Sequence, residues 1–74
     1  TKEDSIELGD VYDKMCLIYE KSQEYHQACR YGEYAVHIFE KYGKEYAIDL
    51  KRAEDNLLLA RAGLQKQIES DCVS

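Results

Sequence analysis

Four side chains that bind metals in many proteins follow one another along an expected helix. They are His26, Cys29, Glu33 and His37, and their spacing places them on one helix face. Because a helix rises about 1.5 Å per residue, the two histidines are separated by roughly 16 Å. One zinc ion, with bonds of about 2 Å, is not reached by both. We therefore expect these residues at the solvent edge, and we predict no metal and no cofactor.

No other combination of residues in the sequence indicates catalysis. There is no glycine-rich phosphate loop, no Ser/His/Asp set and no carboxylate pair that can be assigned to a dry pocket. Cys16, among tyrosines, is typical of a small core residue rather than of a nucleophile. A tyrosine platform for nucleotide bases is disfavoured because Tyr12, Tyr19 and Tyr25 are needed for core packing. We predict that the chain is not an enzyme.

Length and composition indicate one small helical domain. The chain has 74 residues, 45% of them hydrophobic, with no proline and four glycines, which favours long uninterrupted helices. A net charge of −5 disfavours nucleic acid as a partner. No apolar run approaches the roughly 20 residues that span a bilayer, so no membrane insertion is expected. Three cysteines without framework spacing fit reduced thiols, which predicts a cytoplasmic location and leaves a nuclear one open.

Apolar periodicity predicts an all-α fold of three helices in an antiparallel arrangement. The first helix opens near Asp4 and Ser5, where Asp4 and Glu7 have capping-box spacing. It breaks at residues 22–24, a polar stretch that is short enough for the second helix to fold back antiparallel. The second helix runs from Tyr25 to a C-cap at Gly43.

The third helix has the most regular apolar spacing of the sequence. Its stripe consists of Tyr46, Leu50, Ala53, Leu57, Ala60, Leu64 and Ile68. Leu58 and Leu59 widen this apolar face, so we expect the helix to make contacts on two sides. The domain is predicted to span residues 4–70, with a frayed tail at 71–74.

The first two helices resemble a tetratricopeptide repeat, a helix-turn-helix unit with aromatic and small residues at set positions. The matching residues, in one register, are Tyr12, Met15, Cys16, Tyr19, Tyr25, Ala28 and Ala35. Two positions depart from the family pattern, because Gln23 replaces the turn glycine and Gly32 stands where an aromatic ring is usual. The stretch 36–45 looks like the longer repeats of kinesin light chains, and similar helices close the C-terminal region of SET-and-MYND methyltransferases. The third helix looks like the capping helix that ends such arrays.

The resemblance implies a non-enzymatic scaffold for protein–protein interaction, which binds a peptide or a partner helix. Two alternatives stay open. One is a helical accessory fragment of a SET-and-MYND-type enzyme. The other is a microtubule-interacting-and-trafficking domain, a three-helix bundle of similar length with a similar Tyr-x-x-Ala start to its second helix.

In the repeat register, five residues of the first helix face the concave groove that holds the partner: Asp10, Asp13, Leu17, Glu20 and Lys21. The chaperone-binding members of the family place Lys and Asn where Asp13 and Leu17 stand, so a clamp for a terminal carboxylate is not expected. The acidic residues would complement a partner that carries Lys or Arg beside an apolar anchor. It stays open whether these acids face solvent or another subunit instead, and whether copies self-associate through apolar residues such as Leu58 and Leu59.

Overall fold

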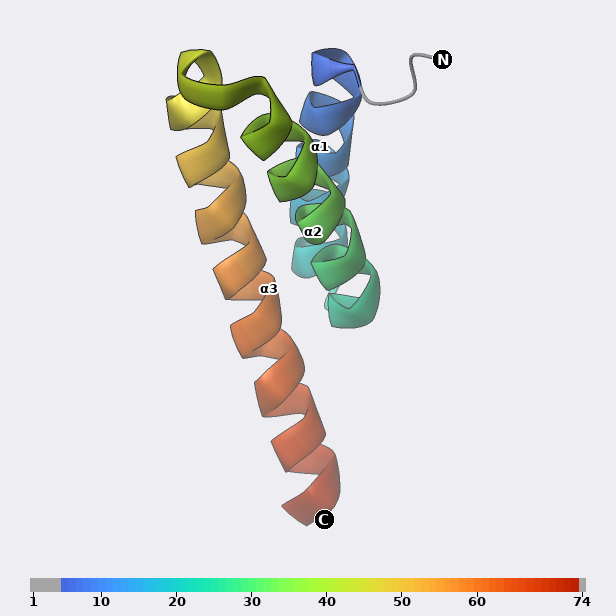
Figure 1. Ribbon diagram of the computed structural model, residues 1–74. Helices are drawn as coiled ribbons and strands as arrows, with labels where there is room; N and C mark the ends of the chain where they lie inside the picture. Colours follow the sequence, from blue (N-terminus) through green and yellow to red (C-terminus); the bar gives the residue numbers. More distant parts are fainter. Residues whose placement is uncertain (1–4, 74) are drawn as a thin grey trace.

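Three α-helices make up the part of the protein that the computed structural model describes, the backbone of residues 5–73 with the side chains of 5–70. They are α1 (Ile6–Lys21), α2 (Tyr25–Tyr42) and α3 (Ala47–Val73), and a short 3-10 turn, η1 (Gly43–Tyr46), joins the last two. α2 runs back alongside α1, and α3 runs back alongside α2 (Figure 1). No strand occurs within these residues, so the predicted all-α three-helix fold is confirmed.

A serine caps the start of α1. The Ser5 hydroxyl accepts a hydrogen bond from the backbone N–H of Leu8 at 3.3 Å, which satisfies one of the free donors of the first turn. The other expected cap, Asp4, lies outside the described residues. Glu7 in the first turn adds a negative charge at the positive end of the helix dipole.

The turn between α1 and α2 closes in a Schellman motif. The backbone N–H of Gln23 donates to the carbonyl of Glu20 at 3.1 Å, and that of Glu24 donates to the carbonyl of Tyr19 at 2.9 Å. Gln23 has φ 64°, the left-handed conformation that glycine usually takes at this position. Glutamine thus takes the left-handed position at which the resemblance leads us to expect a glycine.

The end of α2 lies at the expected glycine. Gly43 follows the last helical residue with φ 81° and ψ −151°, a conformation that is open to almost no other residue type. η1 then reverses the chain, and α3 begins at Ala47.

Small residues let α1 and α2 approach closely. Cys16 of α1 and Ala28 of α2 are completely buried in one cluster, and Ala35 of α2 is completely buried in a second one. These are three of the positions on which the tetratricopeptide resemblance depends.

Four half-exposed tyrosines from α1 and α2 contact one another. The ring of Tyr31 stacks on Tyr12 at 5.7 Å and on Tyr19 at 5.5 Å, and Tyr34 contacts both Tyr12 and Tyr31. Aromatic pairs at these separations stabilise a fold by about 0.5–1.5 kcal/mol each beyond their buried area. The aromatic rings therefore reinforce the hairpin.

α3 packs on α2 through its predicted apolar stripe. Ala53 and Ala60 are completely buried, and Leu57 is nearly so. Leu57 fills the space above Gly32, where an added Cβ would lie 3.0 Å from Leu57 Cδ1 and 3.1 Å from Cys16 Sγ. The ring that the repeat pattern places at position 32 is absent because α3 occupies its space.

A second glycine brings α3 close to the start of α2. An added Cβ on Gly63 would lie only 2.2–2.6 Å from atoms of the Tyr25 ring, so the ring rests directly on the α3 backbone. In one contact Leu57 of α3 covers Gly32 of α2, and in the other Tyr25 of α2 covers Gly63 of α3. Together the two contacts fix the register of α2 against α3.

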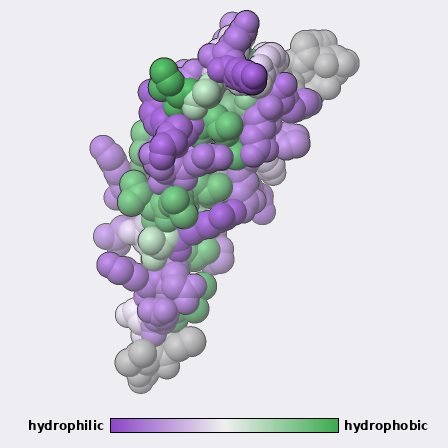
Figure 2. Space-filling view, turned by 60° about the vertical axis from the view of Figure 1, so that its left-hand side comes forward, coloured by the Kyte–Doolittle hydropathy of each residue, from purple (hydrophilic) through white to green (hydrophobic). Residues whose placement is uncertain are grey.

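The far end of α3 projects beyond the other helices. It continues to Val73, past the end at residue 70 that the sequence indicates, and extends well below the α1–α2 turn (Figure 1). Gln67 Nε2 donates to the carbonyl of Gln23 at 3.3 Å, so this turn marks where the contact with the hairpin ends. Leu58 and Leu59 are 62% and 56% exposed, so the second set of contacts expected for them is not made within the described chain. Figure 2 shows the molecule turned so that the side of α3 comes forward, and on this face hydrophobic residues are grouped together and are surrounded by hydrophilic ones.

Candidate functional site

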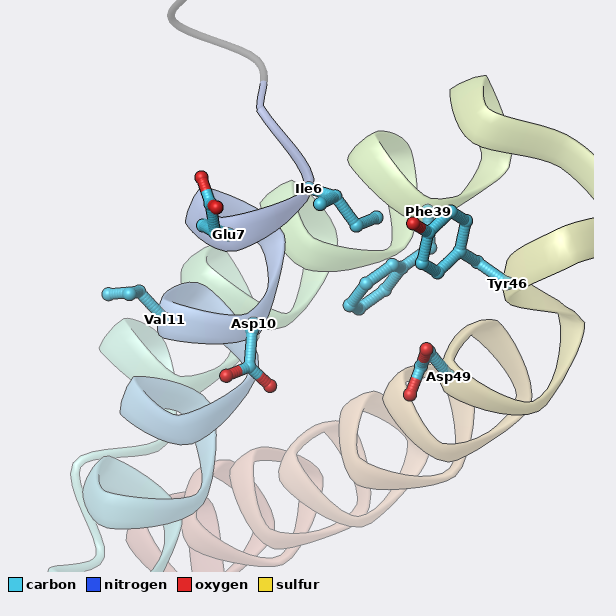
Figure 3. A pocket seen from close by; sticks show the side chains of 7 residues that line it. All are labelled: Ile6, Glu7, Asp10, Val11, Phe39, Tyr46 and Asp49. Carbon is cyan, nitrogen blue, oxygen red and sulfur yellow. The ribbon is translucent and has the colours of Figure 1, made fainter.

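A pocket of about 360 Å³ lies where the start of α1, the end of α2 and the start of α3 meet. Seven residues line it: Ile6, Glu7, Asp10, Val11, Phe39, Tyr46 and Asp49 (Figure 3). Ligand-binding pockets span roughly 300–1,000 Å³, so this one fits a few side chains and not a whole helix.

The floor of the pocket is apolar and belongs to the hydrophobic core. Phe39 is 3% exposed and packs with Ala35 and Ala53, while Ile6 and Tyr46 are half-buried against the same cluster. The rings of Phe39 and Tyr46 lie next to each other at the back of the pocket (Figure 3). This floor is held by α1, α2 and the turn η1, which pack together in one hydrophobic cluster, so it is preformed.

The walls of the pocket are acidic. Asp10 from α1 and Asp49 from α3 stand on opposite sides of the space, whereas Glu7 and Val11 lie on the outer edge of α1 and point away from it (Figure 3). Each aspartate has a cation on its own helix: Lys14 Nζ lies 3.3 Å from Asp10 Oδ2, and Arg52 pairs with Asp49. Exposed pairs of this kind stabilise a helix by only about 0.3–0.5 kcal/mol.

The helix that forms one wall has an excess of negative charge. α1 contains four carboxylates and two lysines, so its formal charge is −2. The members of this set are Glu7, Asp10, Asp13 and Glu20, with Lys14 and Lys21. This excess favours the approach of a cation to α1 over that of an anion.

Of the five groove residues that the sequence indicates, Asp10 alone lines this pocket. Leu17 and Glu20 are half-buried further along α1, and Lys21 is exposed at its last turn, away from the pocket. The predicted groove therefore does not coincide with the pocket.

The Asp13 side chain is buried between helices and does not face a partner-binding groove. It is 6% exposed, and its Oδ1 accepts a hydrogen bond from Asn56 Nδ2 of α3 at 2.9 Å. A partner protein does not reach this carboxylate, so the expectation that it complements a basic partner is corrected. The bond satisfies a buried charge, and loss of its donor is expected to be costly.

Sequence reasoning missed most of the pocket. Tyr46 belongs to the predicted apolar stripe of the third helix, whereas Ile6, Phe39 and Asp49 belong to no predicted site. These four residues come from α1, α2, η1 and α3, up to 43 residues apart, and no local spacing relates them. The one available signal was that Tyr46 starts the third stripe directly after the Gly43 cap, which places it where two helix ends meet.

The metal-like row on α2 does not form a site. His26 and His37 are exposed, Cys29 is half-buried, and Glu33 Oε2 accepts a hydrogen bond from Arg61 of α3 at 3.3 Å. Among the side chains that the structure describes, no group of three or more His, Cys, Asp or Glu residues is placed to hold a metal ion.

The two described cysteines are free thiols of low reactivity. Burial, reinforced by the nearby Asp13 carboxylate, raises the pKa of Cys16 to about 11. Burial also raises the pKa of Cys29, although Arg61 opposes the shift. Since the thiolate is the reactive form, neither residue has the environment of a nucleophile.

None of the described helices is both long and apolar enough to cross a membrane. No protein-family model matches the chain, and no curated protein or solved structure is similar to it. The pocket is thus the feature of this protein that points most directly to a function.

Proposed function

We propose that this protein is a non-enzymatic interaction module: a tetratricopeptide-like hairpin, capped by α3, that binds a peptide or partner helix through the pocket. The observation that carries the proposal is the preformed aromatic floor, Phe39 with Tyr46, between two acidic walls. Apolar surface rimmed by polar groups is typical of protein-binding sites, because its burial by a partner is favourable and the rim sets orientation.

The packing of the hairpin supports the tetratricopeptide part of the proposal. Cys16, Ala28 and Ala35 are fully buried where the family places small residues, and Gln23 has the left-handed φ of the turn glycine. Members of that family bind peptides along the first helix of the repeat, and α1 supplies Ile6 to the floor of the pocket and Asp10 to one of its walls. The free thiols of Cys16 and Cys29 fit a reducing compartment, so we place the module in the cytoplasm or nucleus.

Selection from a random peptide display library tests the proposal. Peptides enriched on the 74-residue chain are expected to lose about tenfold or more in affinity for Tyr46→Ala, because an aromatic contact of the floor is removed. The matched control is Leu59→Ala, which removes an exposed apolar side chain of α3 away from the pocket.

Helical circular dichroism of both variants verifies that they fold. Peptides that bind wild type and Tyr46→Ala equally, or that lose affinity only with Leu59→Ala, would contradict the proposal. Backbone amide shifts of the wild-type chain give an independent map of where the selected peptides bind.

A further inference from the structure

We infer that the pocket selects a partner segment in which an arginine stands beside an apolar residue. This inference rests on the proposed function and adds the chemistry of the partner. It combines two properties of the pocket, an apolar floor and a pair of carboxylates on opposite walls, with a third, the aromatic rings of the floor (Figure 3).

The apolar residue of the partner belongs on the floor. Ile6 and Tyr46, which are half-buried, offer carbon surface there, and its burial by an apolar side chain of the partner is favourable. The volume of about 360 Å³ limits the occupant to such a side chain and one neighbour.

The neighbouring residue is positively charged because Asp10 and Asp49 flank the space (Figure 3). Their own partners, Lys14 and Arg52, are exposed, and a carboxylate has two oxygens that accept several hydrogen bonds. A second cation can therefore bind without displacing the first. A glutamate or aspartate at this place would meet like charge on both sides.

Arginine fits this arrangement better than lysine. Its planar guanidinium donates two parallel hydrogen bonds to one carboxylate and stacks on an aromatic face. The pocket offers both groups, since the carboxylates of Asp10 and Asp49 flank a floor that contains aromatic rings (Figure 3). The compact ammonium group of lysine is attracted by the carboxylates but does not form the paired hydrogen bonds or stack on a ring.

A nuclear magnetic resonance titration tests the inference directly. The probe is the acetylated and amidated hexapeptide Gly-Ser-Leu-Arg-Ser-Gly, with Arg replaced by Lys, by uncharged citrulline or by Glu in three companion peptides. We expect amide shifts at Ile6, Asp10 and Asp49, with affinity about threefold lower for Lys and about tenfold lower for citrulline. The Glu peptide is expected not to bind.

Matched variants assign the charge selectivity to the pocket. Asp10→Asn and Asp49→Asn are each expected to weaken the Arg peptide about threefold to fivefold and to leave the citrulline peptide unchanged. The control is Asp55→Asn, an exposed α3 aspartate that is likewise paired on its own helix, with Lys51 at 3.8 Å, and does not line the pocket. Equal weakening by Asp55→Asn would overturn the inference.

The outcomes separate this inference from the proposed function. If the citrulline peptide binds as tightly as the Arg peptide, or display-selected peptides without arginine shift the same amides, the arginine inference fails and the interaction module stands. If neither kind of peptide shifts the pocket amides, both fail. Shifts of these amides that grow with protein concentration alone would assign the pocket to a second copy of the chain and overturn the inference.

Discussion

Cys16 lies in the hydrophobic core, with Tyr19 and Tyr31 packed against its cluster. A cysteine close to tyrosines could be a nucleophile or a small core residue, and the structure places it completely buried in that cluster. Its burial raises its pKa from 9.0 to about 11, which keeps the thiol protonated at neutral pH. Its role is therefore packing, and its titration is visible as a change in stability.

Stability is expected to fall in alkali because of this residue. The unfolded thiol loses its proton near pH 9.0, whereas the folded one keeps it up to about pH 11. The contribution is complete below pH 9 and is lost as the pH rises to 11, at about 1.4 kcal/mol per unit. Urea unfolding at several pH values in this range, followed by circular dichroism, measures it. In Cys16→Ala the slope should be shallower by this amount, and an unchanged slope contradicts the prediction.

Gln23 is the second residue with a measurable cost. A side chain at φ 64° places Cβ near the backbone carbonyl and costs about 1–2 kcal/mol, which glycine avoids. We therefore expect Gln23→Gly to raise the free energy of unfolding by about 1 kcal/mol in urea titrations. Gln23→Ala keeps the strained Cβ and serves as the control. A gain of the same size in Gln23→Ala would show that strain is not the cause.

At the scale of the helices, the contact between α2 and α3 depends on an absent side chain. Gly63 is where the Tyr25 ring meets the α3 backbone, at distances that exclude a Cβ. The contact joins the first residue of α2 to the middle of α3, so it controls how far α3 can slide along the hairpin.

Gly63→Ala is expected to destabilise the protein by about 1–3 kcal/mol, because the new methyl group forces the ring or the helix to move. In a Tyr25→Ala background the same substitution should stabilise by up to about 1 kcal/mol, since alanine is the better helix former. A double-mutant cycle from urea unfolding measures the difference. Equal effects in the two backgrounds would disprove the contact.

Helix positions were predictable from sequence because their causes are local. The polar stretch at 22–24 and the cap at Gly43 fix the end of α1 and both ends of α2 to within a few residues, whereas α3 continues to Val73, past the last residue of its apolar stripe. The use of Asp13 was not predictable, because its partner Asn56 lies 43 residues away. The empty ring position at Gly32 also depends on a distant residue, Leu57.

The site was less predictable than the helices for the same physical reason. A helix face can be deduced from spacing, but the groove-facing place of Asp10 was expected only from the tetratricopeptide resemblance. The pocket depends on the angle at which three helix ends meet, and that angle follows from long-range packing of Phe39 and Tyr46 rather than from a local pattern.

The whole molecule is elongated, with extents of 45 × 22 × 17 Å, because α3 is much longer than the helices it packs on. Its last turns project beyond the α1–α2 turn (Figure 1). A short helix without tertiary contacts is marginal in water, so stability should differ along α3.

Amide hydrogen exchange can follow this gradient. We expect the amides of residues 68–70 to exchange about 100-fold or more faster than those of Ala53–Ala60, which lie in the packed part of α3. Mass spectrometry after proteolysis, or magnetic resonance, resolves the two stretches. Equal protection would mean that the projecting end is covered, for example by a second copy of the chain, and repeating the measurement at tenfold dilution would reveal such a copy.

The glycine contacts of α3 also constrain how this protein can evolve. Leu57 fills the space that Gly32 leaves, and Tyr25 fills the space that Gly63 leaves, so a change in size at one position of a pair is tolerated only with an opposite change at the other. Related sequences should consequently vary at positions 32 and 57, and at 25 and 63, in reciprocal pairs. Such paired variation would show that the alignment of α3 with α2 is maintained in related proteins.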